Sequence, residues 1–382
     1  PAELYIQDNN IKNLLAHTVK YLKVIPQKKS SFTQHLKIKS SVGEKTVKEA
    51  LISWGSRTEG SLDTPKIFCT SMKHVLELYT YLGENLSRKD AQDLFHSHPT
   101  IFVPVVNCSQ IREDQILIGK MLKREEVWWS DPTDLFTKYR DSLELYMSPL
   151  AKRKFLQCWY NPMEEMFKMA VRVETEPGTY DLAQLLKHIA TVHSLCDTDV
   201  LRDSLFLFSK IGTDLMKITS TVGGVKSTEA QIAEINLPKV INLLTNAAVF
   251  PTKKDQWVSL TDHPMVSDSQ ELEEMFNTKP GVHLLRLEVM ESGNPRNRGH
   301  KNVIDQDALK YCISLFDAIK PLSHCIKTEE ITSHFKQCIK GQKFMHEVVG
   351  LVQRFLFFIF PDVHEKIKEK KAGSLKSLCS AR

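Results

Sequence analysis

The chain has 382 residues, of which 42% are hydrophobic and 25% charged, and its net charge is +5. This is the usage of an ordinary globular protein, and it excludes a collagen-like or broadly disordered chain. The length allows two or three domains. The small positive charge is compatible with an acidic partner but does not require one.

The ends and the cysteines bear on the compartment. The first residue is Pro1, and no basic segment precedes an apolar one as in a secretion signal, so we expect a fragment of a larger intracellular protein, nuclear or cytoplasmic. The 8 cysteines are scattered, which favours buried thiols over a disulfide framework. The most apolar run, Val348 to Phe360, is too short to cross a bilayer, so no membrane partner is expected.

The first 97 residues show helical periodicity. Apolar residues recur at helical spacing over 11–23, and a second helix is predicted over 44–54. Thr70 or Ser71 is placed to cap a third helix. The S-x-x-D pattern that begins at Ser87 predicts a short helix to about Phe95. Residues 1–97 are therefore expected to form an N-terminal helical unit.

The periodicity then changes to that of strands. Residues 101–106, 115–119 and 127–129 are rich in β-branched and aromatic side chains. They predict a small antiparallel β-arm over 98–135. Asp131 as N-cap and Pro132 as first helical residue then predict the start of a helix.

The remaining signals are mostly helical. They predict a helical block over 136–291 with a β-hairpin near 248–260, a helix over 270–276 and a strand over 282–289. A Gly-, Pro- and Asn-rich linker is expected over 292–302, a C-terminal helical unit over 303–362 and a charged tail over 363–382. The predicted fold class is α+β, predominantly α-helical with small antiparallel β-arms or hairpins.

Motifs for chemistry are weak in this chain. Thr221 to Thr228 contains two glycines and a lysine, but the lysine does not follow a glycine and no strand precedes the loop, so no nucleotide site is predicted. Glu125 and Glu126 are interpreted as a solvated strand edge. A Cys/His group lacks the C-x-x-C knuckle of a zinc site, so we expect no metal; it comprises Cys312, His324, Cys325, His334, Cys338 and His346. No catalytic residue and no cofactor are predicted for this chain.

A basic stretch keeps a second class of function open. Arg296, Arg298 and Lys301 lie close together in the predicted linker and could contact phosphates. A nucleic-acid or chromatin-associated scaffold in the nucleus is therefore one alternative. An unrecognised enzyme, which would need a pocket with convergent ionisable side chains, is another.

Three aromatic and proline-rich stretches carry a resemblance to a known family. They are H-P-T-I-F-V-P at 98–104, E-E-V-W-W-S-D-P-T at 125–133 and F-P-T-K-K-D-Q-W-V-S-L at 250–260. Their order resembles the middle region of the NO VEIN family, over about residues 60–290. The hairpin that follows a helical block is also similar to sacsin repeats.

The resemblance implies that this chain is part of a larger protein with an ATPase module. Family members carry a histidine-kinase-like (GHKL) ATPase module upstream, with an Asn-bearing helix and a D-x-G-x-G loop that this sequence lacks. The chain is therefore expected to be a non-catalytic interaction or transducing region, with ATP bound upstream and with protein partners or that module as its contacts. Trp128, Trp129 and Trp257 are the candidate docking points between β-arm and helical block, with plain core packing as the alternative.

Overall fold

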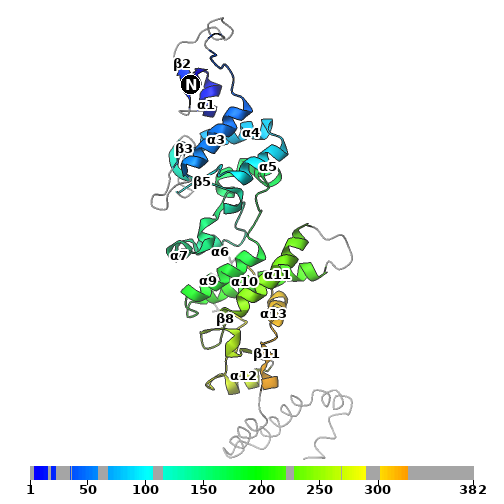
Figure 1. The fold of residues 1–382 in the computed structure, drawn as a ribbon. Helices are drawn as coiled ribbons and strands as arrows, with labels where there is room; N and C mark the ends of the chain where they lie inside the picture. Colours follow the sequence, from blue (N-terminus) through cyan, green and yellow to red (C-terminus); the bar gives the residue numbers. More distant parts are fainter. Residues whose placement is uncertain are drawn as a thin grey trace, which may run out of the picture. The chain divides into compact units, whose positions relative to one another are not determined.

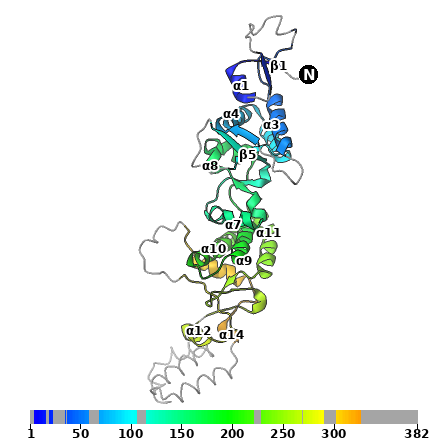
Figure 2. The same ribbon diagram turned by 90° about the vertical axis from the view of Figure 1, so that its left-hand side faces the viewer.

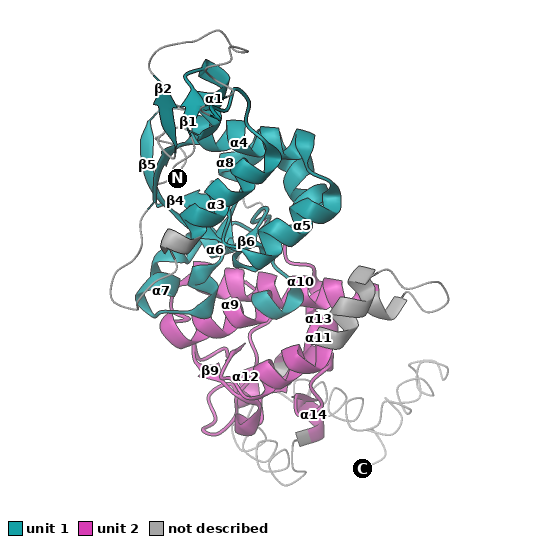
Figure 3. Cartoon of the chain, turned by 45° about the horizontal axis from the view of Figure 1, so that its top comes forward, with its two compact units in different colours: residues 1–181 teal, residues 182–382 magenta. Residues whose placement is uncertain are grey.

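The computed structural model describes residues 4–15, 19–22, 35, 37–58, 68–105, 115–220, 228–267, 269–289 and 302–325. The chain divides into two compact units, residues 1–181 and 182–382, which Figure 3 colours separately. Helices accompany small sheets of two or three strands, so the expected α+β fold is confirmed. The linker over 292–301 and everything after 325 lie outside the described residues.

Unit 1 alternates short helices and strands along the chain (Figure 1). Single 3-10 turns and a π-helix, Met166–Val171, connect some of them. The helices are α1 (Asn9–Leu15), α3 (Glu44–Thr58), α4 (Met72–Asn85), α5 (Arg88–Ser97), α6 (Leu135–Lys138), α7 (Arg140–Leu145) and α8 (Gln157–Tyr160). The strands are β1 (Leu4–Ile6), β2 (Lys20–Leu22), β3 (Phe68–Ser71), β4 (Ile101–Pro104), β5 (Ile116–Leu122), β6 (Val127–Trp128) and β7 (Lys154–Phe155).

The largest sheet of unit 1 joins segments that the sequence placed in separate domains. Its order is β3-β5-β4, and both pairings are antiparallel. The strand β3 was not predicted, and it lies inside the expected helical unit of 1–97. Because β3 pairs with β5 of the expected β-arm, no domain boundary falls at residue 97. The chain turns from β3 directly into α4. Ser71, one of the two residues predicted to cap this helix, is its N-cap and accepts a hydrogen bond from the His74 backbone N–H.

Helices cover one face of this sheet. The strand β5 alternates exposed and buried residues, with Leu117, Gly119 and Met121 on the buried side. The helices α3 and α4 supply buried residues at helical spacing, and together these make one aromatic-rich core. Its members from α3 and α4 include Val47, Leu51, Trp54, Val75, Leu78, Tyr79 and Leu82.

Two buried tyrosines complete the outer edge of the sheet. The strand β4 pairs with β5 on one side only, and the Val105 N–H bonds to Ile118 of β5, so the backbone of Phe102 points the other way. The Tyr79 hydroxyl accepts from the Phe102 N–H at 2.9 Å and donates to the Thr100 carbonyl at 2.7 Å. The Tyr160 hydroxyl donates to the Phe102 carbonyl at 2.6 Å. Both edge groups of Phe102 are thereby satisfied without another strand.

Three local predictions in unit 1 are wrong. The helix expected over 11–23 ends at Leu15, and Lys20–Leu22 is strand β2, parallel to β1. Val127–Trp128 pairs in parallel with β7 instead of extending the antiparallel arm. The helix after Asp131 begins at Leu135, and the Asp131 carboxylate instead accepts from the Thr137 N–H at 3.0 Å. In the first two cases, pairing with another segment overrides a local signal, and in the third the contacts are themselves local.

Unit 2 is built from longer helices. They are α9 (Thr179–Val192), which begins in unit 1, α10 (Thr198–Ser220), α11 (Thr228–Thr245), α12 (Gln270–Phe276), α13 (Gln306–Ser314) and α14 (Leu322–Cys325). The strands are β8 (Phe250–Pro251), β9 (Trp257–Val258), β10 (Met265–Val266) and β11 (Lys320–Pro321). Figure 2 shows α12 and α14 side by side, where Leu272, Phe276 and Leu322 share a small core.

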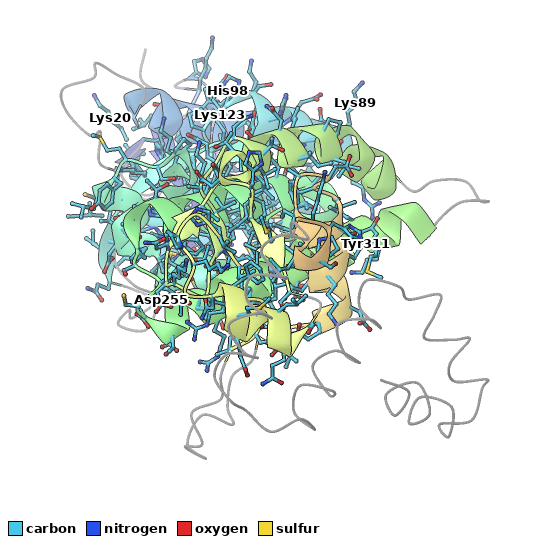
Figure 4. The ribbon with its side chains drawn as sticks, turned by 90° about the horizontal axis from the view of Figure 1, so that it is seen from below. Lys20, Lys89, His98, Lys123, Asp255 and Tyr311 are labelled. Carbon is cyan, nitrogen blue, oxygen red and sulfur yellow. The ribbon has the colours of Figure 1, made fainter. Side chains whose placement is uncertain are left out.

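The helices α10 and α13 pack closely in unit 2. A Cβ at Gly212 would lie 2.0 Å from the Ala308 carbonyl oxygen, so only glycine allows this approach. The Ser209 hydroxyl of α10 accepts from the Asp305 N–H just before α13 at 2.9 Å. α13 itself is capped by Asp305 and carries Tyr311, which Figure 4 labels. Residues expected to form one C-terminal helical unit thus pack, as far as residue 325, against the helical block.

The predicted hairpin near 248–260 is present as β8 and β9, which pair antiparallel. Its turn is tied down by two ion pairs, between Lys253 and Glu273 of α12 and between Asp255 and Arg286 at 2.7 Å; Asp255 is labelled in Figure 4. The predicted strand over 282–289 forms only isolated bridges at Leu284 and Leu285. The acidic helix expected over 270–276 is confirmed as α12.

The close contact at Gly119 makes a test of the sheet. A Cβ at Gly119 would lie 2.4 Å from Cε2 of Phe102 and 2.7 Å from the Val103 carbonyl oxygen. Replacing Gly119 with alanine should therefore destabilise unit 1 by roughly 1–3 kcal/mol through overpacking. Gly43→Ala is the control, because a Cβ there meets nothing within 4 Å. Urea unfolding of both variants measures this, and equal midpoints would show that the sheet adapts freely.

The tyrosine contacts predict an order of effects. Tyr79→Phe leaves a buried N–H and a carbonyl without their partner, so we expect a loss of about 1–3 kcal/mol in the free energy of unfolding. Tyr160→Phe orphans one carbonyl and should cost less, because carbonyls are more often left under-satisfied than N–H groups. Hydrogen exchange of the β4 and β5 amides reads out unit 1 alone, with half-buried Tyr311→Phe in unit 2 as control. Protection unchanged by Tyr79→Phe would contradict this account.

Candidate functional site

The Trp128-Trp129 pair lies at the centre of a joint between three segments of unit 1. The Trp128 and Trp129 carbonyls accept from the backbone N–H groups of Leu156 and Gln157, on one side. On the other side, the Trp129 N–H donates to the Glu174 carbonyl at 2.8 Å. A segment from the expected β-arm is thus held between two segments from the expected helical block.

Both indole side chains are buried. Trp128 stacks on Phe155 with ring centroids 5.3 Å apart and also contacts Phe136. Trp129 faces Phe167 of the π-helix at 6.2 Å. Neither indole nitrogen has a hydrogen-bond partner among the described residues. The two side chains therefore join the β-arm segment to the following block from inside, and they are not exposed for a separate partner.

Arg153 connects this aromatic joint to two carboxylates. Its guanidinium carbon lies 3.9 Å from the Trp128 ring centroid, a cation–π contact on the face of the indole. The same guanidinium forms ion pairs with Glu174 and, at 3.6 Å, with Asp181. We call Trp128, Arg153, Glu174 and Asp181 the Arg153 clamp.

Asp181 lies at the beginning of α9. Its carboxylate accepts from the Gly178 N–H at 3.0 Å, which satisfies one of the free N–H groups at the start of the helix. Burial raises the pKa of Asp181, and the charge of Arg153 and the Gly178 hydrogen bond oppose that rise. The clamp thus couples the Trp128 joint to the first turn of α9.

A second charged group lies on α7 and β7. Glu144 pairs with Lys154 at 2.7 Å, and this hydrogen bond lowers the pKa of Glu144, with further lowering by Arg140 and Lys120. Burial lowers the pKa of Lys154, as do the charges of Arg140 and Lys120. Arg140 also donates to the carbonyls of Ala151 and Arg153. This group thereby fixes the backbone just before and at Arg153 of the clamp.

Trp257 is a separate feature of unit 2. Its indole N–H donates to the His193 carbonyl at 2.9 Å, which ties the hairpin to the residue after α9. Trp257 is half-buried. The structure therefore brings Trp128 and Trp129 together in unit 1 and places Trp257 in the other unit.

The other sequence candidates divide into described and undescribed residues. Arg296, Arg298 and Lys301 lie outside the described residues, as do His334, Cys338 and His346. Within the described ranges, no group of three His, Cys, Asp or Glu side chains could hold a metal ion. Glu125 is exposed beside His96, in a 3-10 turn. The four described thiols form no disulfide, but burial was predicted wrongly for three, because Cys312 is buried whereas Cys69, Cys158 and Cys196 are exposed.

Sequence reasoning missed Arg153 and Asp181. One local signal was present, because an acidic residue such as Asp181 is favoured in the first turn of a helix. Nothing in the sequence pairs Arg153 with Trp128, 25 positions earlier by number. Such a contact depends on the parallel pairing of β6 with β7.

The raised pKa of Asp181 predicts a pH dependence with a definite sign. Since the folded pKa lies above the ordinary value, the contribution of Asp181 to stability is full at low pH and is lost as pH rises through the folded pKa. Arg153→Met removes the charge that opposes burial, so the pKa should rise further and the loss should extend to higher pH. Carboxyl NMR titration of Asp181 measures this directly. Asp181→Asn is the control that abolishes the transition, and a lower pKa in Arg153→Met would contradict the clamp.

Comparison with known proteins agrees with the resemblance in the sequence. The chain is similar to Protein NO VEIN of Arabidopsis thaliana, with 21% identity over 390 residues that cover 98% of this chain. The chain spans only 13% of the length of that curated relative. No family model and no solved structure matches it. In the described residues, no helix is both long and apolar enough to cross a membrane. The match extends well beyond residues 60–290, and the chain is NO VEIN-like over 98% of its length.

Proposed function

We propose that this chain is a non-catalytic interaction or transducing region of a large NO VEIN-like protein in the nucleus or cytoplasm. It would be coupled to a GHKL-type ATPase module elsewhere in that protein, which would bind the ATP. Its contacts would be that module or other proteins.

One observation carries the proposal. The stretch E-E-V-W-W-S-D-P-T, on which the family resemblance rests, forms the joint of unit 1, where Trp128 and Trp129 pack inside. The Arg153 clamp then connects this joint to the first turn of α9, whose later residues belong to unit 2. A change in the joint therefore has a direct covalent and electrostatic route to the start of that helix.

Coupling can be measured in the full-length protein that contains this chain. We expect Arg153→Met to change its rate of ATP hydrolysis by about fivefold or more, the lower end of usual coupling between sites. The matched control is Arg202→Met, which removes an ion pair to Asp199 within one helix of unit 2. Circular dichroism at the assay temperature verifies that both variants remain folded.

Any of four results would overturn the proposal. The full-length protein could fail to hydrolyse ATP, or both arginine variants could hydrolyse it at the wild-type rate. The chain alone could hydrolyse ATP, which would make it an enzyme. Finally, a salt-sensitive affinity for DNA that is lost on replacing Arg296, Arg298 and Lys301 with glutamine would favour the nucleic-acid scaffold.

A further inference from the structure

Exposed apolar side chains cluster in two elements of unit 1. Single exposed apolar residues are normal, but a cluster marks a contact surface. Leu145, Tyr146 and Met147, at the end of α7, are exposed to 75%, 59% and 87%. Ile116 and Ile118 of β5 are exposed to 74% and 49%.

The turn after α7 has a backbone that suits glycine better than methionine. The Ser148 N–H donates to the Leu143 carbonyl at 2.9 Å and the Met147 N–H to the Glu144 carbonyl at 3.1 Å. This is the Schellman pattern of a helix C-terminus, in which the residue at the Met147 position has a left-handed conformation and is usually glycine. Met147 has a φ of 49° there. A side chain at this position costs roughly 1 kcal/mol or more relative to glycine.

Packing within the chain does not offset that conformational cost, because the Met147 side chain is the most exposed of the large apolar side chains in the described residues. Backbone strain of this kind clusters at active sites, ligand clamps and switch regions. A strained, exposed methionine beside an exposed leucine and tyrosine therefore indicates a surface that another body covers.

The charges between the two apolar parts indicate what that body carries. Lys120 lies on β5 two residues after Ile118 and on the same face. Its charge acts on both Glu144 of α7 and Lys154 of β7. Figure 3 shows β5 and α7 along one side of unit 1. The group comprises three cations, Lys120, Arg140 and Lys154, and two carboxylates, Glu144 and Asp131, so cations are in excess by one.

We propose that Ile116, Ile118 and Lys120 of β5, together with Leu145, Tyr146 and Met147, form a docking surface for an acidic, amphipathic segment from elsewhere in the same large protein. We call these six residues the β5–α7 surface. Apolar side chains of the segment cover the exposed ones, and its carboxylates complement the excess of cations.

The choice of an occupant from the same protein rests on the proposed function, in which this chain is part of a larger polypeptide. The NO VEIN relative is far longer than this chain, which matches 13% of it. A segment of the same polypeptide competes at an effective concentration of about a millimolar, which separate proteins rarely reach.

Hydroxyl-radical footprinting of the full-length protein tests the surface through methionine oxidation. Met147 is compared with Met169, which is 61% exposed and lies outside the surface. By exposure alone, Met147 should oxidise faster. If the segment is docked, Met147 should oxidise about fivefold more slowly than Met169, and Lys120→Glu or high salt should reverse this order through charge repulsion or screening.

A second variant separates docking from folding. Met147→Gly suits the left-handed turn, so its melting temperature should equal or exceed that of the wild type. Because the variant lacks the central apolar contact, Tyr146 should nevertheless become more reactive to hydroxyl radicals. A destabilised Met147→Gly protein, or an unchanged Tyr146, would contradict the role given to Met147.

Other outcomes overturn the proposal in distinct ways. Met147 oxidation faster than that of Met169 in the wild type would mean that nothing covers the surface. Protection that appears only with phosphatidylcholine–phosphatidylserine vesicles would make it a membrane contact, and protection lost on dilution would make the occupant a separate molecule. ATP hydrolysis is read independently in the same samples, so a protected Met147 in a protein without ATPase coupling would sustain the docking surface and reject the proposed function.

Discussion

The open edge of strand β4 is the constraint on which unit 1 depends. A strand that pairs on one side only leaves a row of backbone groups that must bond to water or to another partner. Here that edge is buried, so water is not available, and the hydroxyls of Tyr79 and Tyr160 take its place. Burial raises the pKa of both tyrosines, which keeps the hydroxyls neutral and able to donate.

The positions of the helices follow from this. The two hydroxyls must lie within hydrogen-bond distance of Phe102. The helices α4 and α8, which carry the two tyrosines, are therefore fixed against the β4 edge of the sheet. The rings then lie near one another and near Phe167, with centroids 5.1 to 5.6 Å apart. Trp129 also packs near Phe167, so the Trp128-Trp129 joint is an extension of the same aromatic core. By comparison, the exposed ion pairs are worth ~0–1 kcal/mol each and adjust the fold rather than determine it.

Local signals in the sequence found what local interactions determine. The Ser71 and Ser87 caps, the helix over 270–276 and the 248–260 hairpin each depend on a few neighbouring residues, and all are present. Strand β3 was missed because Phe-Cys-Thr-Ser becomes a strand only when it pairs with β5, about 50 residues later. The Arg153 clamp was missed for the same reason, since its members meet only through β6 and β7. The aromatic stretches identified the family resemblance but not their own packing.

A different kind of inference comes from a residue that fits neither its backbone nor its surroundings. At most positions of unit 1 the local preference and the tertiary contacts agree, as at Ser71, which caps its helix, or at Gly119, where a side chain would collide with Phe102. At Met147 the backbone favours glycine and the solvent favours a polar side chain, and the sequence supplies neither. Core packing cannot account for an exposed side chain, and capping cannot account for a methionine. A contact with a body outside this chain would account for both the exposure of the side chain and the choice of methionine. The proposed docking surface therefore lies at a residue that contributes little to the folding of unit 1.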